Sequence, residues 1–154
     1  MQKITPCLWF DSEAEDAAKF YTSVFPNSKI LNIVPYISET PSNKPVGSVM
    51  TVDFELNGQR FTALNGGPFF KINEAISFQV FCKDQTEIDS YWEKLSAVPE
   101  SEQCGWCKDK FGVSWQIIPE NIGELVKSET GMKTFLKMHK IDIKALQEVN
   151  ETNS

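Results

Sequence analysis

Side chains that could perform chemistry are few in this sequence, and histidine is the scarcest of them. The 154 residues include one histidine, His139, in the charged stretch Lys-Met-His-Lys near the C-terminus. A Ser-His-Asp or Cys-His device, like a histidine-rich metal centre, would have to use it. We expect His139 to lie on an exposed turn of a late helix, outside any catalytic arrangement.

Asp53 and Glu55 form a possible pair of catalytic carboxylates. They lie two residues apart in the segment 48–57, where apolar and polar residues alternate, so both are predicted on one face of a strand. Neighbouring carboxylates can divide the roles of general acid and general base. The alternative is that both simply face solvent.

Cys104 and Cys107 have the C-x-x-C spacing of redox and zinc sites. Redox motifs of this type stand at a helix N-terminus, whereas residues 102–108 look extended. A zinc site would need two further ligands at suitable spacing, and the sequence lacks them. We therefore interpret both as structural, with the alternative that Cys104 faces a pocket. Cys7 and Cys82 lie in apolar runs typical of small core residues.

The first half of the chain predicts one helix among four strands. A strand over 3–10 leads into a helix that Asp11 or Ser12 caps and that carries acids in its first turn. Asn57-Gly58 predicts a two-residue hairpin turn. The polar loop 38–47 is either a lid or a plain surface loop. The remaining strands are predicted at 28–37, 48–57 and 59–65.

The second half repeats this order in abbreviated form. It predicts a strand over 75–82, a helix over 85–97 and extended chain over 102–108. A β-prone strand over 113–118 follows, and Pro119 opens a helical tail that runs to about residue 149, broken near 128–131. The apolar residues of this tail would cover either its own domain or a partner subunit.

Composition and charge exclude several classes of partner. The formal net charge of −6 repels phosphate backbones, so nucleic acid is not expected as a partner. No polybasic cluster predicts attachment to a membrane, and no apolar run is long enough for a transmembrane helix or a secretory signal. We expect a cytoplasmic protein with reduced cysteines.

Three passages resemble the glyoxalase/bleomycin-resistance/extradiol-dioxygenase superfamily, which has the vicinal oxygen chelate fold. They are the first helix with its flanks (11–26), the hairpin region (54–59 with 63–68) and the final turn and strand (109–117). The runs Ala-Leu-Asn-Gly-Gly-Pro, Gln-Cys-Gly-Trp and Gly-Val-Ser-Trp-Gln-Ile are similar to the PhnB-like subgroup. That subgroup is often labelled 3-demethylubiquinone-9 3-methyltransferase.

The resemblance implies an α+β fold of two βαβββ modules that form a cupped mixed β-sheet, followed by a C-terminal helical tail. One domain would span 1–150, with modules at about 3–70 and 75–119 and the tail at about 120–149. It also implies a homodimer. Metal-binding members use mostly His and Glu from several strands, but the corresponding positions fall near Pro6, Leu64 or Asn65, Ser77 and Gln116. We therefore expect neither a metal nor another cofactor.

The polar strand faces would converge in the cup, with aromatic residues at its rim, and form a pocket for a small molecule. The predicted ligand-binding residues are Thr51, Asp53, Asn65, Phe70, Ser77, Gln79, Cys104, Trp106, Ser114 and Gln116.

The sequence favours a metal-free protein that binds an unidentified small molecule and whose catalytic residues, if any, are unknown. One alternative is a metal-dependent lyase, isomerase or dioxygenase of the same superfamily. Another is a resistance protein that sequesters a cationic drug in an acidic, aromatic-lined groove. Methyl transfer is not expected, because the turn after the first strand, 11–15, lacks the glycines of an S-adenosylmethionine site.

Overall fold

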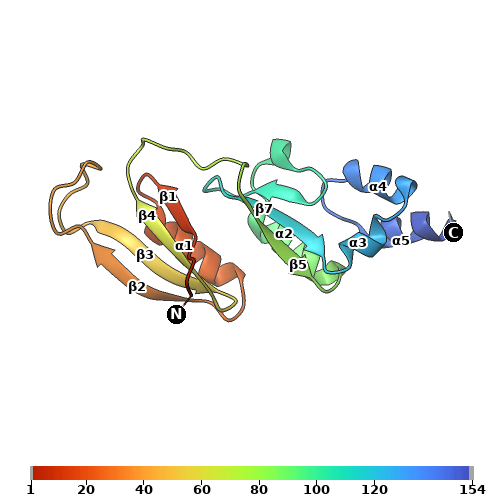
Figure 1. Ribbon diagram of the computed structural model, residues 1–154, viewed down its shortest axis with the longest axis horizontal. Helices are drawn as coiled ribbons and strands as arrows, with labels where there is room; N and C mark the ends of the chain where they lie inside the picture. The colour runs from red at the N-terminus through yellow and green to blue at the C-terminus, as the bar shows by residue number, and fades with distance from the viewer. Residues whose placement is uncertain (1, 153–154) are drawn as a thin grey trace. The chain divides into compact units, whose positions relative to one another are not determined.

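The computed structural model describes residues 2–152, which form two compact units that meet in the sequence between Ile72 and Asn73 (Figure 1). This boundary falls between the two modules that the sequence predicts. Each unit contains its own β-sheet. No helix of the described residues is long and apolar enough to cross a membrane.

The first unit is a four-stranded sheet with one helix. Its strands are β1 (Cys7–Phe10), β2 (Lys29–Pro35), β3 (Val49–Leu56) and β4 (Gln59–Asn65), and its helix is α1 (Ala14–Val24). The spatial order is β1-β4-β3-β2, with β1 parallel to β4 and the other pairs antiparallel. This is the predicted βαβββ module, and the predicted bounds of β4 are confirmed.

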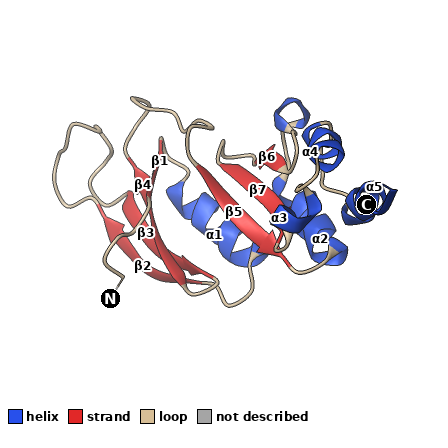
Figure 2. Ribbon diagram, turned by 45° about the vertical axis from the view of Figure 1, so that its right-hand side comes forward, coloured by secondary structure: helices blue, strands red, loops and turns tan. Residues whose placement is uncertain are grey.

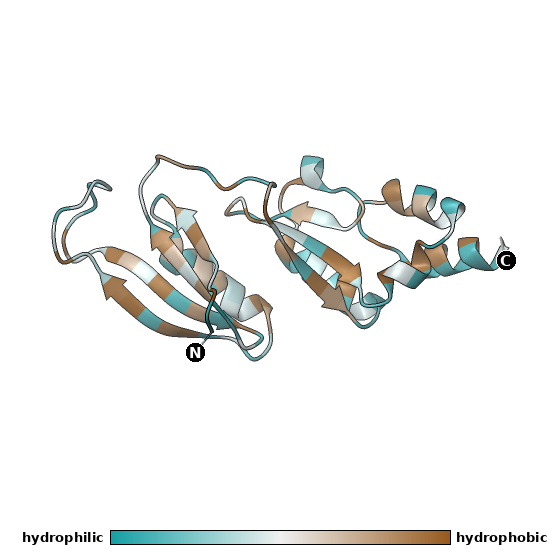
Figure 3. Cartoon of the chain, viewed as in Figure 1, coloured by the Kyte–Doolittle hydropathy of each residue, from teal (hydrophilic) through white to brown (hydrophobic). Residues whose placement is uncertain are grey.

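Alternation along β3 places the core of the first unit on one face of the sheet. Val52, Phe54 and Leu56 are buried and belong to the face on which α1 packs, while the residues between them are half-buried. Figure 3 colours the strands of this sheet by the hydropathy of their residues. Asn57 and Gly58 both have positive φ angles, of 50° and 81°, as a hairpin turn of two residues requires.

Asn65 fastens the elements of the first unit to one another. Its Oδ1 accepts a hydrogen bond from the backbone N–H of Ala14 at 2.8 Å, and its Nδ2 donates to the carbonyl of Val49 at 3.0 Å. The cap predicted from Asp11 or Ser12 is wrong: Glu13 occupies the N-cap position without a side-chain bond. A side chain 51 residues away in the sequence supplies the acceptor instead.

The second unit begins with a smaller sheet. Its strands are β5 (Ser77–Cys82), β6 (Trp106–Lys108) and β7 (Ser114–Pro119), in the order β5-β7-β6. The helix α2 (Gln85–Leu95) packs against β7, and a short 3-10 helix, η1 (Pro99–Ser101), precedes β6 (Figure 2). This module has one strand fewer than the first, because the chain from 96 to 105 forms η1 and a tight turn.

Asp109 holds the turn between β6 and β7. Its carboxylate is buried and accepts hydrogen bonds from the backbone N–H groups of Phe111 and Val113 and from the indole N–H of Trp115. Gly112 closes the turn with a φ of 89°. The residues from Asp109 to Gly112 therefore form a structural turn that sets the direction of β7.

The tail, residues 120–152, contains three helices: α3 (Ile122–Leu125), α4 (Glu129–Leu136) and α5 (Ile143–Thr152). The predicted break near 128–131 lies slightly earlier, at 126–128, and a second break at 137–142 was not predicted. The tail packs on its own unit, where Ile118 of β7 is buried with Leu125, Ile141 and Leu146. The sequence left open whether the apolar residues of the tail cover their own domain or a partner subunit. In the structure they pack on their own unit.

Two predictions about isolated residues differ from the structure. Cys82 is buried as expected, but Cys7 is exposed, so its assignment to the core is wrong. The reason is the parity of β1, which places Leu8 and Phe10 toward the core and Cys7 on the other face. His139 is exposed as predicted, although it lies between α4 and α5 and not on a helical turn.

Candidate functional site

One face of the three-stranded sheet carries polar side chains. Strand pairing aligns Ser77, Ser114 and Lys108 in one row across β5, β7 and β6. The next row contains Gln79, Gln116 and Trp106 in the same order. Because side chains alternate along a strand, all six belong to one face. Trp115 and Ile117, the buried residues that alternate with Ser114 and Gln116 on β7, belong to the face on which α2 packs.

Small-molecule sites are clefts of roughly 300–1,000 Å³, and the cleft at the β6 edge of this polar face has a volume of about 420 Å³. It has a polar and an aromatic wall together with a buried hydroxyl residue, Ser114. Its lining comes from the segment before β5, from η1, and from β6 and β7. The lining residues are Glu74, Glu100, Ser101, Gln103, Cys104, Trp106, Cys107, Lys108 and Ser114.

Charges in the cleft are arranged around a single ammonium group. Lys108 Nζ lies 3.0 Å from Glu74 Oε2, and this hydrogen bond and charge lower the pKa of the Glu74 carboxyl below its usual range. Lys108 is three-quarters buried, whereas Glu74 is 69% exposed. A solvated carboxylate of this kind contributes little to stability. Glu100 adds a second carboxylate, so the lining carries one positive and two negative groups.

The two thiols of the cleft stay protonated at neutral pH. Burial raises the pKa of Cys104, and burial together with the carboxylates of Asp109 and Glu102 raises the pKa of Cys107 to about 12. A thiolate is the nucleophilic form, so neither residue is an activated nucleophile. Since folding raises these values, the stability that protonated thiols contribute is complete below the unfolded thiol pKa and is lost as the pH rises toward 12.

Cys104 and Gly105 form the tip of a tight turn beside the cleft. Gln103 and Trp106 pair with each other through two backbone hydrogen bonds of 3.1 and 2.8 Å. Between them, Cys104 has a φ of 39° and Gly105 one of 90°, the signature of a type I′ turn. The extended conformation predicted for this C-x-x-C segment is therefore wrong at Cys104, and both cysteines line the cleft, not Cys104 alone.

The structure brings together part of the predicted ligand-binding set. Cys104, Trp106 and Ser114 line the cleft. Gln116 Nε2 donates to Ser77 Oγ at 2.8 Å in the neighbouring part of the same face, and Gln79 is exposed further along β5.

Four predicted residues belong to the first unit. Thr51 and Asp53 lie on the half-buried face of β3, where Asp53 accepts a hydrogen bond from Thr62. Asn65 bonds to backbone groups, as described above. Phe70 is exposed and contacts Trp9 edge-on, with 4.9 Å between ring centroids. Their participation in a common pocket with the second unit stays a prediction.

Several residues of the cleft were not predicted. Lys108 could have been found, because it lies two residues after Trp106 on the same strand and so shares its face. Glu74, Glu100 and Gln103 come from loops and η1, and no periodicity in the sequence places such segments beside a sheet.

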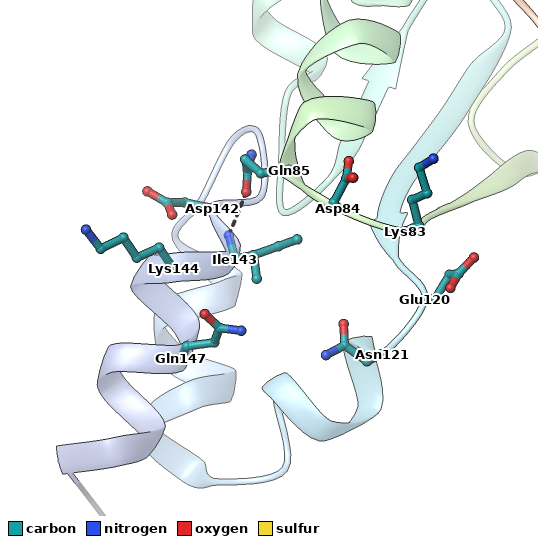
Figure 4. A pocket seen from close by; sticks show the side chains of 9 residues that line it. All are labelled: Lys83, Asp84, Gln85, Glu120, Asn121, Asp142, Ile143, Lys144 and Gln147. Carbon is teal, nitrogen blue, oxygen red and sulfur yellow. Dashed lines mark hydrogen bonds between the residues drawn. The ribbon is translucent and has the colours of Figure 1, made fainter.

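Two other clefts are lined by polar surface residues without an aromatic side chain. The larger, about 440 Å³, lies where the first turns of α2 and α5 meet, and Lys83, Glu120 and Lys144 border it (Figure 4). The other, about 350 Å³, lies in the first unit between the start of α1 and the loop 38–47. Lys44 of that loop donates to Asp11 and Ser12 at 2.7 and 2.6 Å, which fastens the loop across this cleft.

The metal site of the wider superfamily does not fit the side chains of this chain. Within residues 2–152, no three His, Cys, Asp or Glu side chains gather closely enough to hold a metal ion. The groups at the corresponding positions have other partners. Ser77 and Gln116 bond to each other, and Asn65 bonds to Ala14 and Val49.

Comparison with solved structures relates the chain to proteins of the glyoxalase-like fold. The PhnB protein from Bacillus cereus is 37% identical, with 77% of this chain covering 98% of that one and a TM-score of 0.63. A protein from Staphylococcus aureus is 33% identical over 77% and 95% of the two chains, with a TM-score of 0.35. A protein from Pseudomonas aeruginosa, 16% identical over 77% and 97%, shares the fold with a TM-score of 0.56.

No curated protein matches the chain. A family model described as 3-demethylubiquinone-9 3-methyltransferase matches residues 2–118, which include both sheets up to β7 and the cleft. Together with the identity to the Bacillus cereus protein, this match confirms the resemblance found in the sequence. The chain therefore belongs to the PhnB-like family that bears the name 3-demethylubiquinone-9 3-methyltransferase.

Proposed function

We propose that the protein binds a small, partly aromatic molecule in the cleft beside β6, without a metal ion. The observation that carries this proposal is the lining of that cleft. It joins the half-buried indole of Trp106, the buried residue Ser114 and the three-quarters buried side chain of Lys108 in about 420 Å³. Aromatic walls with a few placed polar groups are the general pattern of small-molecule sites.

Methyl transfer, the activity in the family's name, has no support in the site. The connection between β1 and α1 contains Asp11, Ser12 and Glu13, so it lacks the glycine turn that brings a helix N-terminus close to a nucleotide-like cofactor. The described strands form sheets of four and three strands, and neither is a doubly wound parallel sheet.

Blocking the cleft tests the proposal. Ser101 lies on η1 at the surface of the unit and lines the cleft, so Ser101→Trp fills the space without entering the core. The neutral fluorescent probe N-phenyl-1-naphthylamine reports binding, because its emission rises in an apolar site. We expect saturable binding to the unmodified protein with one site per chain, and about tenfold or greater weakening in Ser101→Trp, because the new ring occupies the ligand volume.

Gln147→Trp is the matched control, since it adds the same ring to the lining of the cleft between α2 and α5. It should leave the affinity for the probe unchanged. Equal affinity in Ser101→Trp and in the unmodified protein would refute binding in the β6 cleft.

Sequestration of a cationic drug is a second candidate, favoured by the two carboxylates, Glu74 and Glu100, around Trp106. Carboxylates and an indole face both attract an organic cation. The same titration with the cationic dye proflavine distinguishes sequestration from the binding of a neutral molecule. If proflavine binds more tightly than the neutral probe, and if salt weakens its binding, the result would indicate sequestration.

A further inference from the structure

Hydrogen bonds connect the tail to the turn at residues 103–106, which forms one wall of the candidate cleft. The backbone N–H of Cys104 donates to the carbonyl of Met138 at 2.6 Å, and that of Gly105 donates to the carbonyl of His139 at 2.8 Å. The side chain of Gln103 also donates to the carbonyl of Leu136. Three consecutive residues of the turn are thus bonded to the end of α4 and to the segment that joins α4 to α5.

Packing reinforces these hydrogen bonds at Gly105. A Cβ atom at this position would lie 2.9 Å from Ile141 Cδ1 and 3.2 Å from Ile118 Cγ2, so the turn and the tail are in close contact. Ile141 and Ile118 are buried in the same apolar cluster. Ile118 follows Ser114 and Gln116 on their face of β7 by alternation. The tail therefore covers one end of the polar face, and the cleft occupies the other.

The segment that joins α4 to α5 is in turn hydrogen-bonded to Gln85 of α2, and we call this contact the latch. Gln85 Nε2 donates to the carbonyl of Ile141, and its Oε1 accepts from the backbone N–H of Ile143, both at 2.9 Å (Figure 4 draws the second bond). Gln85 does not line the β6 cleft. It can therefore be changed without touching a bound molecule.

The tail lies outside the part of the chain that defines the family. The family match ends at residue 118, and 77% of this chain already covers 98% of the Bacillus cereus protein. The turn at residues 103–106 is thus held by the tail, which lies beyond the residues that the family model matches. The positive φ of Cys104 persists only while surrounding contacts determine it.

We infer that the tail is a positioning element of the cleft: by holding residues 103–105, it sets the wall against which the ligand binds and so determines ligand affinity. This inference rests on the proposed function, because it concerns binding in the same cleft. Opening of the tail would lower the fraction of molecules with a formed wall, and the apparent dissociation constant rises in inverse proportion to that fraction.

Gln85→Ala tests the inference from the tail side, with amide hydrogen exchange and probe titration as paired measurements. We expect the amides of Cys104 and Gly105 to exchange about tenfold faster, since the latch loses two hydrogen bonds. The Kd of N-phenyl-1-naphthylamine should rise about threefold with the number of sites per chain unchanged. A purely structural defect would instead lower the number of sites at constant Kd.

Two further variants complete the experiment. Gln147→Ala removes an exposed amide from α5, near the same latch, and should change neither measurement. Gly105→Ala acts from the turn side, where its Cβ meets Ile141, and should shift both measurements in the direction of Gln85→Ala.

Faster exchange at Cys104 and Gly105 with an unchanged Kd would overturn the inference and leave the proposed function intact. Unchanged exchange in both Gln85→Ala and Gly105→Ala would overturn it as well. Failure of the proposed function has a different signature: the unmodified protein and Gln147→Ala would not bind the probe, while exchange still accelerated in Gln85→Ala.

Discussion

Replacement of Asp109 by alanine is expected to lower the free energy of unfolding of the second unit by about 3 kcal/mol. The carboxylate is buried and accepts from two backbone N–H groups and from the Trp115 indole, at 2.8 to 3.2 Å. Alanine leaves these donors without their acceptor in a region with little access to water. Asp109→Asn should cost less, because its remaining oxygen can still accept from the backbone while its amide opposes the indole N–H.

Native-state amide exchange of β7 is the suitable measurement, because it reports the second unit separately from the first. Glu93→Ala, which removes an exposed carboxylate from α2 in the same unit, serves as the control and should change stability by less than about 0.5 kcal/mol. If Asp109→Ala were as stable as Glu93→Ala, the carboxylate would not hold the β6–β7 turn.

Asn65→Ala should destabilise the first unit by about 2 to 3 kcal/mol. The substitution leaves the Ala14 N–H and the Val49 carbonyl without their side-chain partner, and both belong to elements that pack in the core. The N-terminal turn of α1 should fray first, since no side chain of its own caps it.

Amide exchange of α1 and β4 measures this loss, and Asn32→Ala on the exposed face of β2 is the matched control. This experiment distinguishes the two roles considered for Asn65, ligand binding and the fastening of the first unit. A structural residue gives fast exchange in α1 and unchanged binding of the probe to the second unit. Unchanged exchange in Asn65→Ala would contradict the fastening role.

Local patterns in the sequence predicted most of the fold. The alternation in 48–57, the Asn57-Gly58 turn and the helical spacing in 85–97 depend on neighbours in the chain, and the structure confirms all three. The cap of α1 could not be predicted in the same way, because its acceptor is Asn65 from the end of β4. Likewise, the break at 137–142 lies where Met138 and His139 accept hydrogen bonds from the backbone of Cys104 and Gly105, contacts that no helical period encodes.

The candidate site was predictable only where it lies on strands. Ser114 and Trp106 follow from strand parity and line the cleft. Glu100 and Gln103 come from irregular chain whose path is set by tertiary contacts, such as the hydrogen bond of Ser96 to Glu102. Cys7 shows the converse: an apolar run suggested burial, but the parity of β1 places it on the face away from the core and leaves it exposed.

The most direct test of binding in the β6 cleft is an NMR titration of the isotope-labelled protein with N-phenyl-1-naphthylamine. The account predicts shifts of the Trp106 indole N–H and of the amides of residues 101–108. It predicts no shifts around Lys83 and Lys144 or along β3, which lie in the other cleft and the other unit. Shifts confined to those regions, with Trp106 unchanged, would contradict it.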